Sequence, residues 1–137
     1  MLLDSNIIIY ASLPEYPNLR QFVLQNAPKV SAISHLEILG YHLLSSEEQK
    51  YFEQFFKAAS VLPISEEIIN QAISLRQQKK MSLGDSIIAA TSLEYSLKLV
   101  TRNTKDFNWI STLELLNPID ENSEKAEKGR YSVENGS

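Results

Sequence analysis

Short apolar runs alternate along the chain with longer segments whose apolar residues recur at helical spacing. The short runs predict strands, and the longer segments predict helices. The strands are expected at residues 1–3, 30–33, 61–64, 97–101 and, more briefly, 113–116. Pro63 lies within the third run. Because proline has no amide hydrogen for the ladder, this strand is expected at an edge of its sheet or shortened.

Helices are expected between and after these strands. They are placed at residues 7–10, 18–27, 36–44, 51–56, 65–80 and 82–96. In the helix over 65–80, the residues Ile68, Ile69, Ala72 and Ile73 are expected along one stripe. Strands that alternate with helices predict an α/β fold of three layers, in which helices cover both faces of a central parallel sheet of about four to five strands.

The chain has 137 residues, the size of one ordinary domain with a single core. We expect this domain to span residues 1–118. Residues 119–137 are polar and poor in hydrophobic side chains, so a disordered tail is expected there. No apolar run approaches the roughly 20 residues that span a bilayer, and no signal peptide precedes the first strand. A cytoplasmic protein without membrane contact is therefore expected.

Composition excludes several kinds of chemistry. The chain has no cysteine, which rules out disulfides, zinc–thiolate sites and thiol nucleophiles. Its 13 Lys and Arg against 17 Asp and Glu give a net charge of −4. A protein that covers nucleic-acid phosphates with basic side chains would be positively charged. Any role with nucleic acid therefore has to rest on a metal ion or a small basic patch.

Four acidic residues follow apolar runs and stand where helices are expected to begin: Asp4, Glu37, Asp85 and Asp106. Loops that leave the carboxyl ends of parallel strands share one edge of a sheet, so these four side chains are expected to meet there. Close carboxylates cannot all stay ionised unless a positive charge lies among them. Mg²⁺ and Mn²⁺ prefer oxygen ligands of this kind. The pattern therefore predicts a divalent-metal site.

Each acid also has a purely structural interpretation. The segments that begin at Ser82 and Ser34 fit a capping box, in which Asp85 and Glu37 would satisfy amides at a helix start. Asp4 is a candidate cap, and Asp106 would lie in the first turn of a helix capped by Thr104. One cap contributes about 1 kcal/mol, so helices commonly have one. Both interpretations remain open from the pattern alone.

The neighbours of the four acids favour a shared site over caps. Ser5 and Asn6 follow Asp4 directly, and Thr101 and Asn103 precede Asp106. Gly84 costs about 1 kcal/mol inside a helix and would allow a close backbone approach beside Asp85. Other chemistry has weaker support: the two histidines are expected in ordinary surface or half-buried positions, and no nucleophile elbow or glycine-rich phosphate loop is present.

Three segments together resemble a known family. They are LLDSNIIIY at residues 2–10, SAISHLEILG at residues 31–40 and LGDSIIAATSLEYSLKLVTRNTKDF at residues 83–107. In order and spacing they resemble the PIN-domain ribonucleases, most closely the small VapC-type toxins of toxin–antitoxin pairs. The resemblance covers residues 1 to about 118. It implies a PIN-like fold, Mg²⁺ or Mn²⁺ at the acid cluster, endonucleolytic cleavage of RNA and, more loosely, a homodimer and a cognate antitoxin.

The resemblance also implies roles for single residues. Asp4 and Asp85 would be the main metal ligands, and Glu37 and Asp106 would act directly or through water. Some PIN domains have another acid at the position of Asn103. The remaining candidates would orient the carboxylates or contact substrate phosphates, and they are Ser5, Asn6, Thr101, Arg102, Asn103 and Lys105. The basic residues Arg76, Lys79 and Lys80 are further candidates for phosphate contact.

Two other classes of function are considered beside the ribonuclease. A catalytically silent PIN-like module that binds RNA or protein would keep the acids as caps. A phosphoaspartate receiver domain would need an aspartate after the strand at 61–64, where Ser65 stands, so this class is disfavoured. The aromatic-rich stretch from Tyr41 to Phe56 is expected to pack in the core, with an antitoxin-binding groove as the alternative.

Overall fold

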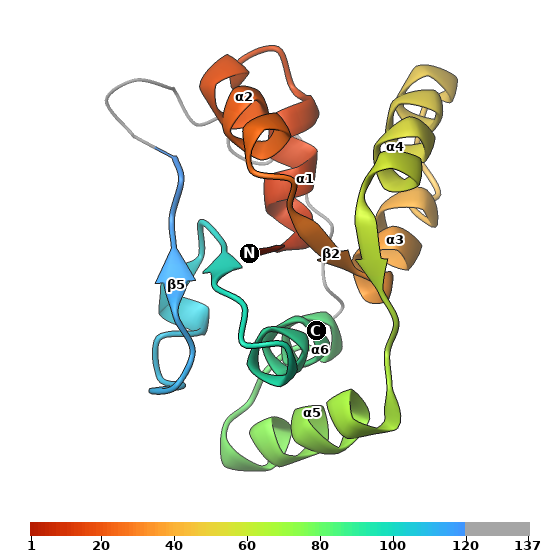
Figure 1. Ribbon diagram of the computed structural model, residues 1–137. Coiled ribbons are helices and arrows are strands. Elements are labelled where there is room, and N and C mark those ends of the chain that lie inside the picture. Colours follow the sequence, from red (N-terminus) through yellow and green to blue (C-terminus); the bar gives the residue numbers. More distant parts are fainter. Residues whose placement is uncertain (120–137) are drawn as a thin grey trace.

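Five parallel strands form one sheet in the order β3-β2-β1-β4-β5, as the computed structural model of residues 1–119 shows (Figure 1). The strands are β1 Leu2–Leu3, β2 Lys29–Ser31, β3 Ser60–Leu62, β4 Leu99–Val100 and β5 Leu115–Leu116. All four pairings between neighbouring strands are parallel. The predicted α/β fold with a parallel sheet is confirmed, and the sheet has five strands. The strand with Pro63 behind it lies at an edge, as predicted.

Helices cover both faces of the sheet. They are α1 Ser5–Ser12, α2 Pro17–Gln25, α3 Ala32–Leu39, α4 Ser46–Ala58, α5 Glu66–Gln78 and α6 Leu83–Glu94, with a short 3₁₀ helix, η1, at Thr104–Asp106. In Figure 1, α1 and α2 lie on one side of the sheet and α5 and α6 on the other. The molecule thus has three layers.

Successive residues of a strand point to opposite faces, and this places a core on each side of the sheet. Leu3 and Val100 pack on the side of α1 to α4, together with Ile7 and Ile8. Leu2 and Leu99 pack on the other side against α5 and α6, where Phe107 is also buried. Residues 2 and 3 therefore anchor both cores, and the strand that precedes Asp4 is held from two sides.

Capping side chains fix several element ends, and two predicted boundaries were wrong. The Ser31 hydroxyl accepts a hydrogen bond from the Ile33 amide, so α3 begins at Ala32 and the strand ends earlier than predicted. Gly40 is the C-cap of α3, which ends the helix before Leu43. Leu43 is 68% exposed and is not part of the apolar stripe that the spacing predicted.

The buried stripe of α5 also differs from its prediction. Ile68 and Ala72 are buried as one stripe, and Leu75 continues it. Ile69 and Ile73 are 42% and 51% exposed. Both positions lie outside the stripe of Ile68, Ala72 and Leu75 that packs in the core with residues of α6. The predicted stripe was therefore too wide.

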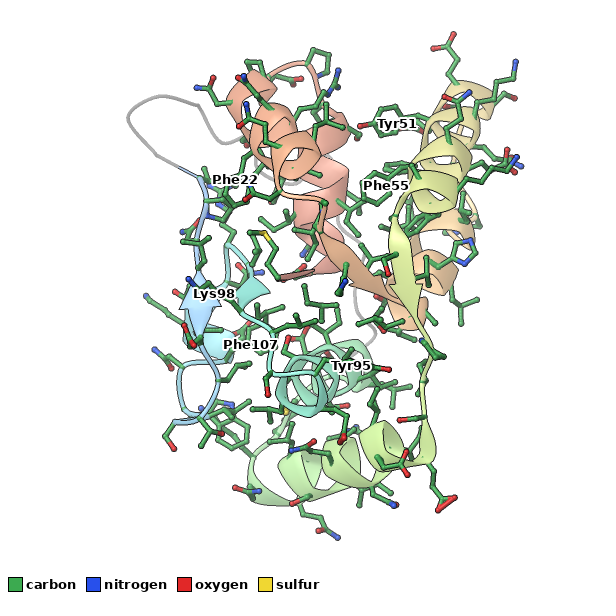
Figure 2. The ribbon with its side chains drawn as sticks, viewed as in Figure 1. Phe22, Tyr51, Phe55, Tyr95, Lys98 and Phe107 are labelled. Atoms are coloured by element: carbon green, nitrogen blue, oxygen red, sulfur yellow. The ribbon has the colours of Figure 1, made fainter. Side chains whose placement is uncertain are left out.

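The aromatic residues of α4 serve mainly as core. Phe52 and Phe56 are buried, and Tyr51 and Phe55 pack half-buried against the same cluster. Figure 2 shows Tyr51 and Phe55 on the side of α4 that faces α1. The Arg20 guanidinium lies 5.7 Å from the centre of the Tyr51 ring and links α2 to α4. Core packing is thus the main role of this stretch, as predicted.

The described part of the chain ends in the core, where Ile119 is 7% exposed. The rest of the predicted tail, from residue 120 on, lies outside the described residues, so the domain boundary stays a prediction. Among the helices of residues 1–119, none combines the length and the apolar character that crossing a bilayer requires.

Candidate functional site

Three of the four predicted acids lie in segments that follow strands of the sheet. The fourth, Asp85, lies at the start of a helix that follows another helix. Asp4 follows β1, Glu37 lies in the helix after β2, and Asp106 lies in η1 after β4. Asp85 was expected after a strand, but the element before it is helix α5. It joins the others because α6 begins at this edge of the sheet and contacts α3.

Asp4 is the most buried of the acids, at 6% exposure. It caps α1, since its Oδ1 accepts a 2.7 Å hydrogen bond from the Asn6 amide. Its Oδ2 accepts a second bond of 2.7 Å from the Thr101 hydroxyl, 97 positions away. Burial raises the pKa of Asp4, these hydrogen bonds oppose the rise, and the charge of Asp106 adds to it. The residue is thus both the predicted cap and part of a long-range contact.

Glu37 has no capping role, so this structural interpretation was wrong. The helix is capped by Ser31 instead, and Glu37 lies beyond its first turn. The Glu37 carboxylate accepts a 2.9 Å hydrogen bond from the Ser5 hydroxyl, which is also 2.8 Å from the hydroxyl of Ser34. Burial raises the pKa of Glu37, the Ser5 bond opposes this, and the charge of Asp4 adds to the rise.

Asp85 lies in the first turn of α6, where its amide donates a 3.0 Å hydrogen bond to the Ser82 hydroxyl. Ser82 is therefore the helix cap, as predicted. Burial raises the pKa of Asp85 to about 6, and the charges of Asp4, Asp106 and Glu37 contribute to this rise. The charges of the other three acids thus all act on Asp85. The structure brings together the residues that the pattern singled out.

Asp106 is the exposed member of the cluster. Thr104 was predicted to cap its helix, but Thr104 lies inside η1 and the cap position is Asn103, which makes no side-chain cap bond. The Asn103 amide donates a 3.1 Å hydrogen bond to the Thr101 hydroxyl. Thr101 therefore connects Asp4 to the turn that carries Asp106.

Gly84 allows the close approach that was predicted beside Asp85. A Cβ atom at this position would lie 2.6 Å from Oε2 of Glu37, closer than real Cβ contacts come. The absence of a side chain therefore lets the Glu37 carboxylate rest against the first turn of α6. Glu37 and Asp85 are brought together by this contact.

We expect Gly84→Ala to separate activity from stability. Alanine favours the helix by up to about 1 kcal/mol, so the melting temperature should stay level or rise. The new methyl group must displace the Glu37 carboxylate, and shifts in groups that support a metal site cost about 10- to 100-fold in activity. Thermal melts and activity assays of the variant test this. A stable variant with wild-type activity would contradict it.

The donor set suits a hard divalent cation. The four acids offer carboxylate oxygens, and burial together with the charges of neighbouring acids raises the pKa values of Asp4, Glu37 and Asp85. Within residues 1–119, no group of three or more acidic or histidine side chains has an arrangement that could hold a metal ion. A cation here would be held by fewer carboxylates with water completing its shell, which is usual for Mg²⁺.

The basic residues beside Asp106 point to different neighbours. The Arg102 guanidinium lies 5.3 Å from the centre of the Tyr10 ring in α1. Lys105 instead lines a groove toward α5.

The sequence did not indicate the roles of Ser34 and Tyr10. Ser34 was interpreted as a cap, and only its distance from Ser5 in the folded chain reveals the hydroxyl pair.

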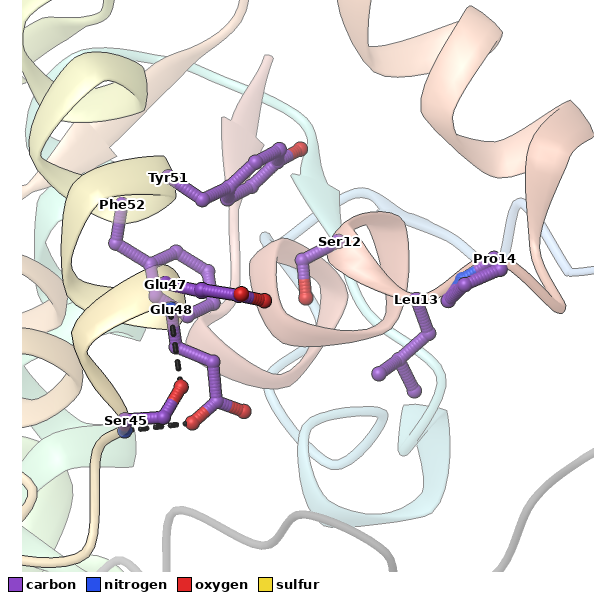
Figure 3. A pocket seen from close by; sticks show the side chains of 8 residues that line it. All are labelled: Ser12, Leu13, Pro14, Ser45, Glu47, Glu48, Tyr51 and Phe52. Carbon is purple, nitrogen blue, oxygen red and sulfur yellow. Dashed lines mark hydrogen bonds between the residues drawn. The ribbon is translucent and has the colours of Figure 1, made fainter.

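A separate hollow of about 500 Å³ lies between the end of α1 and α4 (Figure 3). Tyr51, Glu47 and Glu48 face it from α4, Ser12 from the end of α1, and Leu13 from the C-cap of α1. Figure 3 also shows the complete capping box that holds Glu48 at the start of this helix. The hollow is acidic and aromatic, and it is distinct from the carboxylate cluster.

Comparison with protein families matches residues 1–111 to the PIN domain. Among solved structures, a toxin–antitoxin complex from Klebsiella pneumoniae is similar, with a TM-score of 0.70, 28% identity and coverage of 87% of this chain and 98% of that chain. DNA-bound VapBC from Salmonella typhimurium has a TM-score of 0.76 at 19% identity, covering 86% and 97%. VapBC-1 from nontypeable Haemophilus influenzae has 0.71 at 24%, covering 85% and 96%. The last two show the fold alone. No curated protein matched the sequence.

Proposed function

The chain belongs to the PIN domain family, and we propose that it is a Mg²⁺- or Mn²⁺-dependent endoribonuclease that hydrolyses RNA at its four-carboxylate cluster. The observation that carries this proposal is how the acids are held. Thr101 binds Asp4 across 97 positions, and Ser5 binds Glu37 across 32. Capping needs only local contacts, whereas these contacts fix carboxylates from distant segments relative to one another.

In this proposal Asp4 and Asp85 hold the ion, with Glu37 and Asp106 ligating directly or through water. A bound Mg²⁺ or Mn²⁺ would place positive charge beside a phosphodiester oxygen and would lower the pKa of a water molecule bound to it. The Thr101 hydroxyl and the Asn6 amide favour the ionised form of Asp4, because both donate hydrogen bonds to its carboxylate.

The other polar residues have supporting roles. Ser5 orients Glu37 through its 2.9 Å hydrogen bond. The Asn103 amide bonds to Thr101 and so holds the turn before Asp106. Arg102 follows β4 at the edge of the sheet that carries the acids, and its guanidinium lies against the Tyr10 ring. We assign it to the binding of a substrate phosphate. Substitution of residues that hydrogen-bond to metal ligands commonly lowers metal affinity or activity 10- to 100-fold.

We further propose that the enzyme is the toxin of a toxin–antitoxin pair, acts in the cytoplasm and forms a homodimer. The similar Klebsiella pneumoniae structure is a toxin–antitoxin complex, which supports an antitoxin partner for this chain. The hollow between α1 and α4 is the proposed docking place for an antitoxin segment. Its lining residues Glu47, Glu48 and Tyr51 would suit a segment with basic and apolar side chains.

A silent PIN-like binding module is the second candidate. It is favoured by one observation: within the described residues, no three potential ligands are arranged to hold an ion directly. This candidate predicts that divalent metals neither stabilise the protein nor promote cleavage. The enzyme predicts both effects.

Metal-dependent cleavage of RNA is the direct test. We expect the purified protein to cut structured RNA with single-stranded loops when Mg²⁺ or Mn²⁺ is present, because the unpaired nucleotides of a loop can be splayed out against a protein surface. EDTA should stop the cuts, and excess metal should restore them. Denaturing gels with labelled RNA measure the products. Cleavage that persists in EDTA, or no cleavage with either metal, would contradict the proposal.

A further inference from the structure

A groove of about 430 Å³ adjoins the carboxylate cluster between the end of α5 and the start of α6. Asp85 and Asp106 form its border with the cluster. Its other charged lining residues are all basic: Arg76, Lys79, Lys80 and Lys105. The groove thus combines four positive charges with two members of the acid cluster, in a chain whose net charge is −4.

The positions of these cations are tied to the turn that carries Asp106. The Lys79 ammonium lies 5.8 Å from the centre of the Trp109 ring, and the Trp109 indole donates a 3.2 Å hydrogen bond to the Asp106 carbonyl. The Arg76 Nε donates a 3.3 Å bond to the Met81 carbonyl in the loop before α6. These contacts hold Lys79 near the turn that carries Asp106, and Arg76 near the loop before α6.

The macrodipole of α5 explains only part of this arrangement. Cations near a helix C-terminus are favourable, which accounts for Arg76 and for Lys79 at the C-cap. It does not account for Lys105, which comes from η1 and faces the same groove across the start of α6. Two segments of the chain thus contribute positive charge to one hollow.

We propose that this groove binds the sugar–phosphate backbone of single-stranded RNA beside the bond that is cut. The inference rests on the proposed function and names where its substrate lies. The carboxylate cluster repels phosphates, so an RNA strand needs favourable contacts next to it. Four cations bordering two of the acids supply such contacts and hold the neighbouring phosphates, while the carboxylates remain available for the metal.

The inference is tested with the double variant Lys79→Met/Lys80→Met. Both side chains are exposed, and methionine is only one atom shorter than lysine, so folding should be unaffected. The matched control is Lys50→Met/Lys57→Met, which removes two exposed lysines from α4. Binding of a labelled single-stranded RNA is measured by fluorescence anisotropy at several salt concentrations. EDTA is present throughout, so that no metal-dependent cleavage occurs.

We expect the groove variant to raise the Kd roughly five- to tenfold and to lower the slope of log K against log salt by about 0.7 for each lost phosphate contact. The control should leave both unchanged. Trp109→Leu should weaken binding less than the double variant, because it releases Lys79 without removing its charge. Equal effects of groove and control variants, or an unchanged salt slope in the groove variant, would overturn the inference.

Cleavage assays with Mn²⁺ separate this inference from the proposed function. If both hold, the groove variant raises KM and keeps kcat near the wild-type value. If the wild type binds RNA through the groove in EDTA but never cuts it, the proposed function fails and the groove assignment stands. If the wild type cuts RNA and the groove variant has the same KM and Kd, the groove assignment fails alone.

Discussion

Asp85→Asn is expected to abolish metal-dependent cleavage without destabilising the protein. The change removes one proposed metal ligand while keeping the size and shape of the side chain. A catalytic ion contributes several kcal/mol to a phosphodiester reaction, and each 1.4 kcal/mol is tenfold in rate, so a loss of at least about a hundredfold is expected. Initial cleavage rates at saturating Mn²⁺ measure it.

The stability of the same variant shows whether the lost activity is chemical in origin. Burial raises the pKa of Asp85, and the charges of Asp4, Asp106 and Glu37 add to this rise. Replacing it by a neutral amide relieves this repulsion, so the melting temperature without metal should stay level or rise above pH 6. Glu94→Gln, at the exposed far end of α6, is the control and should keep full activity. Cleavage within a few-fold of wild type in Asp85→Asn would remove this residue from the site.

A second large effect is expected in thermal melts with Mn²⁺. A ligand that binds only the folded state stabilises it by about 2.7 kcal/mol at 100 times its Kd. For a domain of this size, that raises the melting temperature by on the order of 10 °C. Asp85→Asn should lose most of the shift, and Glu94→Gln should retain it. A wild-type protein that melts at the same temperature with and without metal would favour the silent binding module.

This stabilisation should depend on pH in a defined direction. The pKa of Asp85 is raised from 3.8 to about 6 in the folded protein, so the carboxyl is largely protonated at pH 5 and a metal ion must displace the proton. The shift with Mn²⁺ should therefore be larger at pH 7.5 than at pH 5. A shift that is the same at both pH values would exclude Asp85 as a ligand.

The metal-free protein should show the opposite trend. A carboxyl whose folded pKa lies above its unfolded pKa contributes stability below pH 3.8 and loses it as the pH rises through about 6. The raised pKa values of Asp4 and Glu37 act in the same direction. Titrations of melting temperature with and without Mn²⁺ should therefore diverge as the pH increases.

The sequence predicted the fold because strand and helix periodicities are local signals. Leu2 and Leu3 form a strand whose alternate residues serve two cores, and the acid that follows marks its end. The exact element ends depended on single caps. Ser31 started α3 early and Gly40 ended it, and neither outcome follows from apolar spacing. Asp85 reached the site through a helix start, which the strand-end rule does not cover.

The site was predicted as a set of residues but not as a set of contacts. The cluster of Thr101 and Asn103 near Asp106 was visible in the sequence, but the bond from Thr101 to Asp4 exists only in the folded chain. Lys105 and the basic end of α5 were named as candidates for phosphate contact, but only the packing of α5, α6 and η1 shows that Lys79 and Lys105 line one groove. Such contacts depend on tertiary structure rather than on local pattern.

The position of β1 in the middle of the sheet determines when during translation the carboxylate cluster can assemble. Leu2 pairs with Leu99, and Asp4 is held by Thr101, so the first acid stays without its partner until the last part of the domain is made. A nascent chain on the ribosome therefore has no complete cluster, and a product truncated before Thr101 never acquires one. Under the proposed function, aborted synthesis is expected to release fragments without nuclease activity.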